Sequence, residues 1–109
     1  MKTLFGIFLA SCLFTSAAYA GYVKGTVIKL IVRDDGLHYV HIAGEMKDRP
    51  TCAQNHTYWM VKDENSVYGK SQYSMLLAAK ASGKVVTVSG TGTCTRWKDG
   101  EDIQYVSMD

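Results

Sequence analysis

The first twenty residues limit what the rest of the chain can fold into, because they have the pattern of an export signal. Lys2 provides a positive start, residues 3–14 form a short apolar run, and residues 18–20, Ala-Tyr-Ala, form a small-x-small cleavage site. The apolar run is too short to span a membrane, and no later stretch has the necessary length. We therefore predict a signal peptide over residues 1–20 and a single secreted or periplasmic domain over residues 21–109.

A second interpretation of this segment is a lipid anchor. Residues 9–12, Leu-Ala-Ser-Cys, resemble a bacterial lipoprotein box, in which Cys12 would carry lipid and hold the domain on a membrane. Cleavage there would leave a further apolar stretch, beginning with Leu13 and Phe14, directly behind the anchor. Release after Ala20 is therefore the preferred prediction.

Two of the three cysteines, Cys52 and Cys94, remain after such a cleavage. Export takes them to an oxidising compartment, where paired cysteines form disulfides. A domain of this size lies near the limit at which a hydrophobic core alone suffices. We therefore predict a Cys52–Cys94 disulfide whose loss would be nearly fatal to the fold.

The hydrophobic pattern predicts five strands and one helix. The strands are expected at residues 24–33, 37–43, 56–62, 84–89 and 101–108. In the first strand the alternation puts one set of side chains on a common face: Thr26, Ile28, Leu30 and Val32. Asp-Asp-Gly at 34–36 predicts a hairpin turn, and Asp-Gly at 99–100 predicts a second turn.

The helix is expected between the third and fourth strands, with Ser71 as its N-cap and Gly83 as its end. One face carries residues at helical spacing: Tyr73, Leu76, Leu77 and the stem of Lys80. The order strand, strand, strand, helix, strand, strand is that of an OB-fold, a five-stranded, partly open barrel whose gap the helix covers. Ferredoxin-like and other small α+β sheets need a helix directly after the first strand, where this chain has a hairpin.

Several kinds of site are disfavoured by the residue pattern. His38 and His41 are three apart on a strand and point to opposite faces, so they cannot share a metal ion. Cys52 and His56 have ligand-like spacing, but a zinc site with Cys94 would require reduced thiols after export. No metal or cofactor is therefore predicted.

Catalysis is disfavoured for a similar reason. The acidic residues at 34–35, 63–64 and 99–102 all lie at turn signals, where solvated turns explain them, and no nucleophile motif is present. The formal net charge is +2, Lys2 contributes one of these charges, and the signs are interspersed, so no phosphate-binding stripe exists for a nucleic acid. We predict a binding protein and not an enzyme.

The predicted disulfide brings together an aromatic and polar set from two distant segments. Its members are His56, Tyr58, Trp59, Arg96, Trp97 and Lys98. An exposed indole flanked by hydrogen-bonding groups can stack on the apolar face of a sugar ring while those groups bind its hydroxyls. Taken one by one, the preferred interpretation of each tryptophan is packing, with Trp97 over the barrel end and Trp59 in the core.

The C-terminal stretch resembles the end of the cholera-toxin and heat-labile-enterotoxin B subunits. Residues 94–100, Cys-Thr-Arg-Trp-Lys-Asp-Gly, run into residues 103–108, Ile-Gln-Tyr-Val-Ser-Met, so that a cysteine, a tryptophan, a polar turn and a final strand follow in the same order. The resemblance implies a pentamer that binds cell-surface glycans, with Trp97 stacking on a terminal sugar and Lys98 donating to a hydroxyl.

The chain also departs from that family. Its cysteine-to-tryptophan spacing is one residue longer, it lacks the family's N-terminal helix, and its first cysteine precedes the third strand instead of lying in that helix. The preferred function is an exported module that binds an oligosaccharide or glycan near Trp97, using Arg96, Lys98, His56 and Tyr58. The alternative is a protein-interaction or ring-forming module with Tyr73, Leu76 and Leu77 as its interface. A small hydrolase would need two carboxylates, or a histidine and a carboxylate, converging in a pocket.

Overall fold

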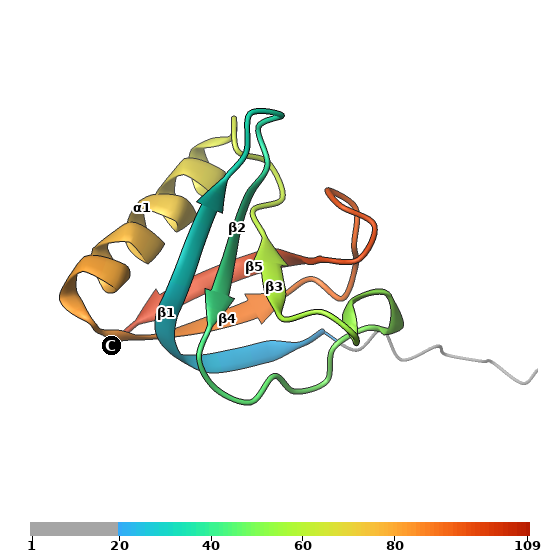
Figure 1. Cartoon of the computed structure of the whole chain (residues 1–109), viewed down its shortest axis with the longest axis horizontal. Helices are drawn as coiled ribbons and strands as arrows, with labels where there is room; N and C mark the ends of the chain where they lie inside the picture. Colours follow the sequence, from blue (N-terminus) through green and yellow to red (C-terminus); the bar gives the residue numbers. More distant parts are fainter. Residues whose placement is uncertain (1–19) are drawn as a thin grey trace, which may run out of the picture.

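The computed structural model describes residues 20–109, which form a β-barrel with one α-helix beside it (Figure 1). The predicted signal peptide up to residue 19, with Cys12, lies outside the described residues. The strands are β1 (Tyr22–Val32), β2 (His38–Ile42), β3 (Tyr58–Met60), β4 (Val85–Gly90) and β5 (Glu101–Met108). The helices are the short 3-10 helix η1 (Thr51–Ala53) and α1 (Val67–Ser82), and α1 follows β3.

The barrel is closed, which corrects the prediction of a partly open one. Its strand order is β1-β2-β3-β5-β4, and β4 pairs back to β1. Closure depends on a short parallel pairing between β3 and β5, in which Trp59 is opposite Glu101 and Met60 is opposite Asp102. Because this pairing joins the two halves of the sheet, α1 does not fill a gap. It packs on β1, β4 and β5 from outside (Figure 1).

The core fills the barrel and extends beneath α1. Trp59 is its largest fully buried side chain, which agrees with the packing interpretation of this residue. From the helix, Leu76 and Ala79 join the same cluster, whose barrel members are Val23, Val27, Val40, Ile42, Trp59, Val61, Val86, Val88 and Ile103. Within residues 20–109, no helix has both the length and the apolar character needed to cross a membrane.

The prediction that Thr26, Ile28, Leu30 and Val32 share one face of β1 is wrong in part. Val23 and Val27 are buried, whereas Ile28 is 57% exposed and Val32 is 53% exposed. The pairing register with β2 shifts between Val27 and Lys29, which is a β-bulge. An extra residue at this point reverses the inward and outward positions along the rest of the strand. Up to the bulge the buried positions are therefore Val23 and Val27, and Thr26 and Ile28 of the predicted face are exposed. Beyond it Leu30, from the predicted face, packs against the core.

The helix begins earlier than predicted. Ser66 is the N-cap, and its Oγ accepts a hydrogen bond from the Gly69 backbone N–H at 2.9 Å, so Ser71 lies inside the helix. The end agrees with the prediction, because Gly83 adopts the left-handed conformation with φ of 67°. The buried residues of α1 are Gly69, Gln72, Leu76 and Ala79.

This burial changes the predicted helix interface. Leu76 is fully buried and belongs to the core, so it cannot contact a partner. Leu77 is exposed, and Tyr73 is half-buried with its ring edge against His38, at 4.8 Å between centroids. Of the three residues, only Tyr73 and Leu77 reach the surface.

Candidate functional site

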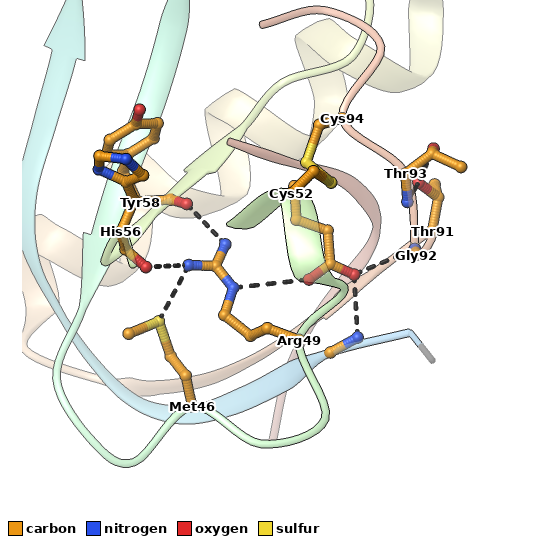
Figure 2. Close-up of polar contacts among 11 residues, drawn as sticks. Met46, Arg49, Cys52, His56, Tyr58, Thr91, Gly92, Thr93 and Cys94 are labelled. Atoms are coloured by element: carbon orange, nitrogen blue, oxygen red, sulfur yellow. Dashed lines mark hydrogen bonds and ion pairs between the residues drawn. A yellow bond between two sulfur atoms is a disulfide. The ribbon is translucent and has the colours of Figure 1, made fainter. Parts of the chain in front are cut away.

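The predicted disulfide is confirmed. Cys52, in η1, is bonded to Cys94, in the loop between β4 and β5, with a Cα–Cα distance of 6.3 Å (Figure 2). The bond fastens the segment that precedes β3 to the loop that carries Trp97. Two segments distant in the sequence are thereby held at one end of the barrel.

A cavity of about 120 Å³ lies next to this loop, on the outer side of β2 and β3. Its lining residues are Arg33, Leu37, Tyr39, Tyr58, Met60 and Trp97. Leu37 and Met60 are almost fully buried and form an apolar floor, and three aromatic rings and one guanidinium surround it. The cavity therefore combines an apolar base with hydrogen-bonding groups at its edge.

Strand register explains why the tyrosines share this cavity. Tyr39 is paired with Met60 across β2 and β3, and Val40 is paired with Trp59. Paired side chains point to the same face of a sheet, so burial of Val40 and Trp59 in the core turns Tyr39 and Met60 outward. Tyr58 is two residues before Met60 and faces outward as well.

Trp97 closes one side of the cavity. It is half-buried, and the guanidinium of Arg33, from the β1–β2 hairpin, lies 5.1 Å from the centroid of its ring. This is within the range of a cation–π contact. Arg33 also pairs with Asp35 at 2.8 Å, which keeps it at the end of the hairpin. Arg33, which positions the indole, was not among the predicted site residues.

A histidine–carboxylate pair lies beside the cavity. His56 Nε2 is 3.3 Å from Asp99 Oδ2, and the Tyr58 hydroxyl donates a hydrogen bond to Asp99 Oδ1. The rings of His56 and Tyr58 are 5.3 Å apart between centroids. Tyr58 lines the cavity, whereas His56 and Asp99 do not. The pair therefore supports the rim and orients the Tyr58 hydroxyl.

Burial and the hydrogen bond to Asp99 together raise the pKa of Tyr58 to about 12. We expect Tyr58 to remain protonated when exposed tyrosines ionise near pH 10. In Asp99→Asn the pKa of Tyr58 should fall, because the negative charge that opposes the phenolate is removed, while burial keeps the pKa above its ordinary value. Spectrophotometric titration near 295 nm, with Tyr58→Phe to identify the signal, measures this shift. A tyrosine signal at position 58 that already titrates near pH 10 in the unmodified protein would contradict the arrangement.

The other two predicted ligand residues do not line the cavity. Arg96 turns to Glu64, with Nε 3.0 Å from Oε2 and Nη2 2.5 Å from Oε1, a two-pronged contact. This hydrogen bond lowers the pKa of the Glu64 carboxyl. Lys98 is exposed in the turn between Trp97 and Gly100. Of the five predicted residues, Trp97 and Tyr58 meet in the cavity, His56 lies beside it, Arg96 turns to Glu64, and Lys98 is exposed outside the lining.

Two carboxylates predicted to be solvated in turns are instead buried. Asp102 is fully buried and accepts hydrogen bonds from the loop that carries Trp97: from Thr93 Oγ1, from Thr95 N and Oγ1, and from Arg96 N at 3.1 Å. Asp102 is in β5, as predicted, but its carboxylate faces this loop, and four donors compensate its charge. These bonds hold the loop, and therefore Trp97, in place.

Glu101 is the second buried carboxylate, and its partner is Arg49. Glu101 Oε1 is 3.5 Å from Arg49 Nε, and both side chains are almost completely buried. Arg49 donates to the backbone carbonyls of His56 and Tyr58 (Figure 2). Its guanidinium also lies 4.3 Å from the centroid of the Trp59 ring. Arg49 therefore connects the segment before β3 with β3 itself and with β5. Nothing in the local sequence around residue 49 or 101 indicates this contact.

The histidines lie in different surroundings. His38 Nδ1 is 2.8 Å from the Gly36 carbonyl, and His41 Nδ1 is 3.0 Å from Thr57 Oγ1. Burial and the nearby Lys29 lower the pKa of His41. Among residues 20–109 there is no group of three histidine, cysteine, aspartate or glutamate side chains that could hold a metal ion. The chain matches no protein-family model, no curated protein and no solved structure.

Proposed function

We propose that the barrel is an OB-fold and that its cavity binds one sugar ring of an oligosaccharide or glycan. The strand order β1-β2-β3-β5-β4, with α1 between β3 and β4, supports the fold proposal. OB-folds bind oligosaccharides and oligonucleotides on the face of the second and third strands and on the loops after the first and fourth strands. The cavity lies where these four parts meet.

The observation that carries the ligand class is the meeting of Trp97, Tyr39 and Tyr58 around one small cavity. Aromatic rings bind the C–H face of a sugar, and the Arg33 guanidinium provides donors for its oxygens. The Tyr58 hydroxyl gives its proton to Asp99, so its oxygen can accept a hydrogen bond from a sugar hydroxyl. The cavity is smaller than the roughly 300–1,000 Å³ of sites that enclose a drug-sized ligand. We propose that it takes a terminal ring, with the rest of the ligand lying along the surface.

The proposed protein is exported and binds without catalysing a reaction. The disulfide is compatible with the oxidising compartment to which residues 1–20 would direct the chain. A hydrolase would need its histidine–carboxylate pair in the pocket, whereas His56 and Asp99 lie outside the cavity lining. The interspersed charges of the chain favour a glycan over a nucleic acid.

Glycan-array binding of the exported protein tests this proposal. We expect Trp97→Ala to reduce binding about tenfold or more, because the stacking ring is removed, while the circular dichroism spectrum is unchanged. Tyr105→Ala is the matched control, since Tyr105 is an exposed aromatic residue on β5 that does not line the cavity, and it should bind like the unmodified protein. A folded, monomeric protein that binds no glycan would end the proposal.

A second candidate function is a protein-interaction or ring-forming module. The observation that favours it is that Tyr73 and Leu77, four residues apart on α1, are neighbours on one side of the helix and both reach the surface. Neighbouring apolar side chains at a surface are typical of a contact with another chain. Native mass spectrometry tests it, because a ring of identical subunits gives a single mass that is a multiple of the protomer. In that case Leu77→Ser, which leaves the buried Leu76 in place, should shift the protein to monomers.

A further inference from the structure

The backbone nitrogen of Gly21 is held by a buried carboxylate. It donates a hydrogen bond to Glu101 Oε2 at 2.9 Å, and the two residues are 80 positions apart in the sequence. Gly21 is buried, whereas the preceding residue, Ala20, is exposed. The carbonyl of Gly21 in turn accepts a hydrogen bond from the Gly90 N–H at 2.8 Å. Residue 21 is therefore the point at which the chain enters the folded domain, and both of its polar backbone atoms have partners.

The Glu101 carboxylate can accept a further hydrogen bond. Its Oε2 accepts from Gly21 N and also from Gly92 N at 3.0 Å. Its Oε1 has Arg49 Nε at 3.5 Å and, among the described residues, no hydrogen bond. The Arg49 guanidinium directs its other nitrogens to the carbonyls of His56 and Tyr58. The carboxylate is thus completely buried, and one of its oxygens lacks a well-placed donor.

The space around the Glu101 carboxylate accommodates the backbone of residues 21 and 90 but no side chain at either position. A Cβ atom on Gly21 would lie 2.6 Å from Glu101 Oε1 and 3.0 Å from Arg49 Cγ. A Cβ atom on Gly90 would lie 1.9 Å from Glu101 Oε2. Because the Glu101 side chain is buried on all sides, it cannot move aside as a surface side chain could. Glycine at position 21 is therefore required by close approach to the carboxylate.

We propose that Glu101 is a receptor for the α-ammonium group that cleavage creates at Gly21. Hydrolysis by a signal-peptide-removing peptidase breaks the Ala20–Gly21 bond. Water supplies its oxygen to the Ala20 carbonyl carbon, which leaves as a carboxylate, and both of its hydrogens to the Gly21 nitrogen, which becomes an ammonium. The uncut chain offers Glu101 one neutral N–H at this position, whereas the cut chain offers a positive charge and three N–H donors.

Removal of the leader would then complete a buried ion pair. A hydrogen bond between charged groups stabilises a protein by roughly 1.5–3 kcal/mol, against roughly 0.5–1.5 kcal/mol for a neutral one. Arg49 and the ammonium would share the carboxylate, and Arg49 retains its two carbonyl partners. The inference rests on the export part of the proposed function and is independent of the glycan site.

The first test locates the cut. The full chain, residues 1–109, is expressed in a bacterial host that exports it, and the purified protein is analysed by intact mass and N-terminal sequencing. We expect Gly21 as the first residue. A chain that begins elsewhere would overturn both this inference and the predicted cleavage.

The second test measures how much a charged amine at Gly21 contributes to stability. The domain is produced as a fusion to an exported carrier protein, and a peptidase that leaves no extra residue then removes the carrier. One fusion yields protein that begins at Gly21, and a second, the matched control, yields protein that begins at Ala20. We expect the unfolding equilibrium constant to be about tenfold larger for the Ala20 form. In Glu101→Gln, which keeps an acceptor oxygen but no charge, the two forms should differ less than about twofold. An equal difference with glutamate and with glutamine would overturn the ion pair.

A third measurement needs no variant at Glu101. Reductive methylation with formaldehyde, followed by peptide mapping, reports how accessible each amine is. The α-amine of the Gly21 form should react at least about tenfold more slowly than that of the Ala20 form, while the lysines serve as an internal reference. Equal rates for the two α-amines would show a free amine at Gly21. That result would contradict the proposed ion pair but not the predicted cleavage site.

Discussion

Replacing Cys52 and Cys94 together by alanine is expected to lower the free energy of unfolding by about 4 kcal/mol. The bond closes a loop with a sequence separation of 42, and cross-linking such a loop restricts the unfolded chain. The stability of domains ranges over roughly 5–15 kcal/mol, and small domains lie near its lower end, so the loss removes most of the total. We therefore expect the variant to be largely unfolded near body temperature, as is often found when a small domain loses its disulfide. Urea unfolding followed by circular dichroism measures the difference.

Thr51→Ala serves as the control for this experiment. Thr51 is exposed and adjacent to Cys52 in η1, so its removal tests whether a change in that segment is harmful in itself. We expect a change within about 0.5 kcal/mol for the control. A double alanine variant with the stability of the unmodified protein would mean that the barrel core is sufficient without the crosslink.

Glu101→Gln is expected to lower the free energy of unfolding by roughly 3–5 kcal/mol. The substitution leaves the Arg49 guanidinium, whose side chain is 5% exposed, without a counterion in the interior. Burial already lowers the pKa of Arg49, and the charge of Glu101 opposes that effect. Chemical unfolding of the unmodified protein and the variant, both beginning at Gly21, measures the loss.

A surface ion pair in the same barrel serves as the control for the buried Arg49–Glu101 pair. Lys24 Nζ is 3.8 Å from Asp109 Oδ2, and the two side chains are 64% and 91% exposed. Lys24→Ala should therefore change the stability by less than about 1 kcal/mol. If Glu101→Gln is as mild as Lys24→Ala, the Arg49–Glu101 contact does not have the structural role that its burial indicates.

Local signals predicted the parts of the fold that depend on a few adjacent residues. Asp-Asp-Gly at 34–36 turns the chain between β1 and β2, Gly83 ends α1, and β5 has the predicted bounds. A turn or a helix end requires a particular backbone conformation at one position, and the residue type there reports it directly. The disulfide was predictable because the predicted cleavage leaves only two cysteines.

Features that depend on three-dimensional neighbours were missed or misplaced. The bulge after Val27 in β1 reverses the face of later residues, and it arises from the pairing with β2. Ser66 and Ser71 both have the chemistry of an N-cap, and the turn before the helix decides between them, because the Asp63 carbonyl accepts from both Ser66 N and Ser66 Oγ. Barrel closure depends on the short pairing of β3 with β5, which no pattern in either strand encodes.

The candidate site shows the same division. Trp97 and Tyr58 were expected together, because the crosslink between their segments limits how far apart they can be, and they line one cavity. Arg96 was also placed there on proximity alone, yet Glu64 holds it elsewhere. Arg33 and Tyr39 were absent from the prediction, since they reach the cavity through the hairpin and the register of β2.

By itself, the sequence determined that this chain is mainly β with one helix and one disulfide, because alternation, turn residues and cysteine count are local or compositional properties. Tertiary structure decided which charges are buried. Glu101 and Asp102 begin the predicted last strand directly after an Asp-Gly turn and were expected to be solvated, yet both are completely buried. A carboxylate can be buried when donors from distant segments surround it, and the positions of Arg49, Thr95 and the Gly21 nitrogen exist only in the folded barrel.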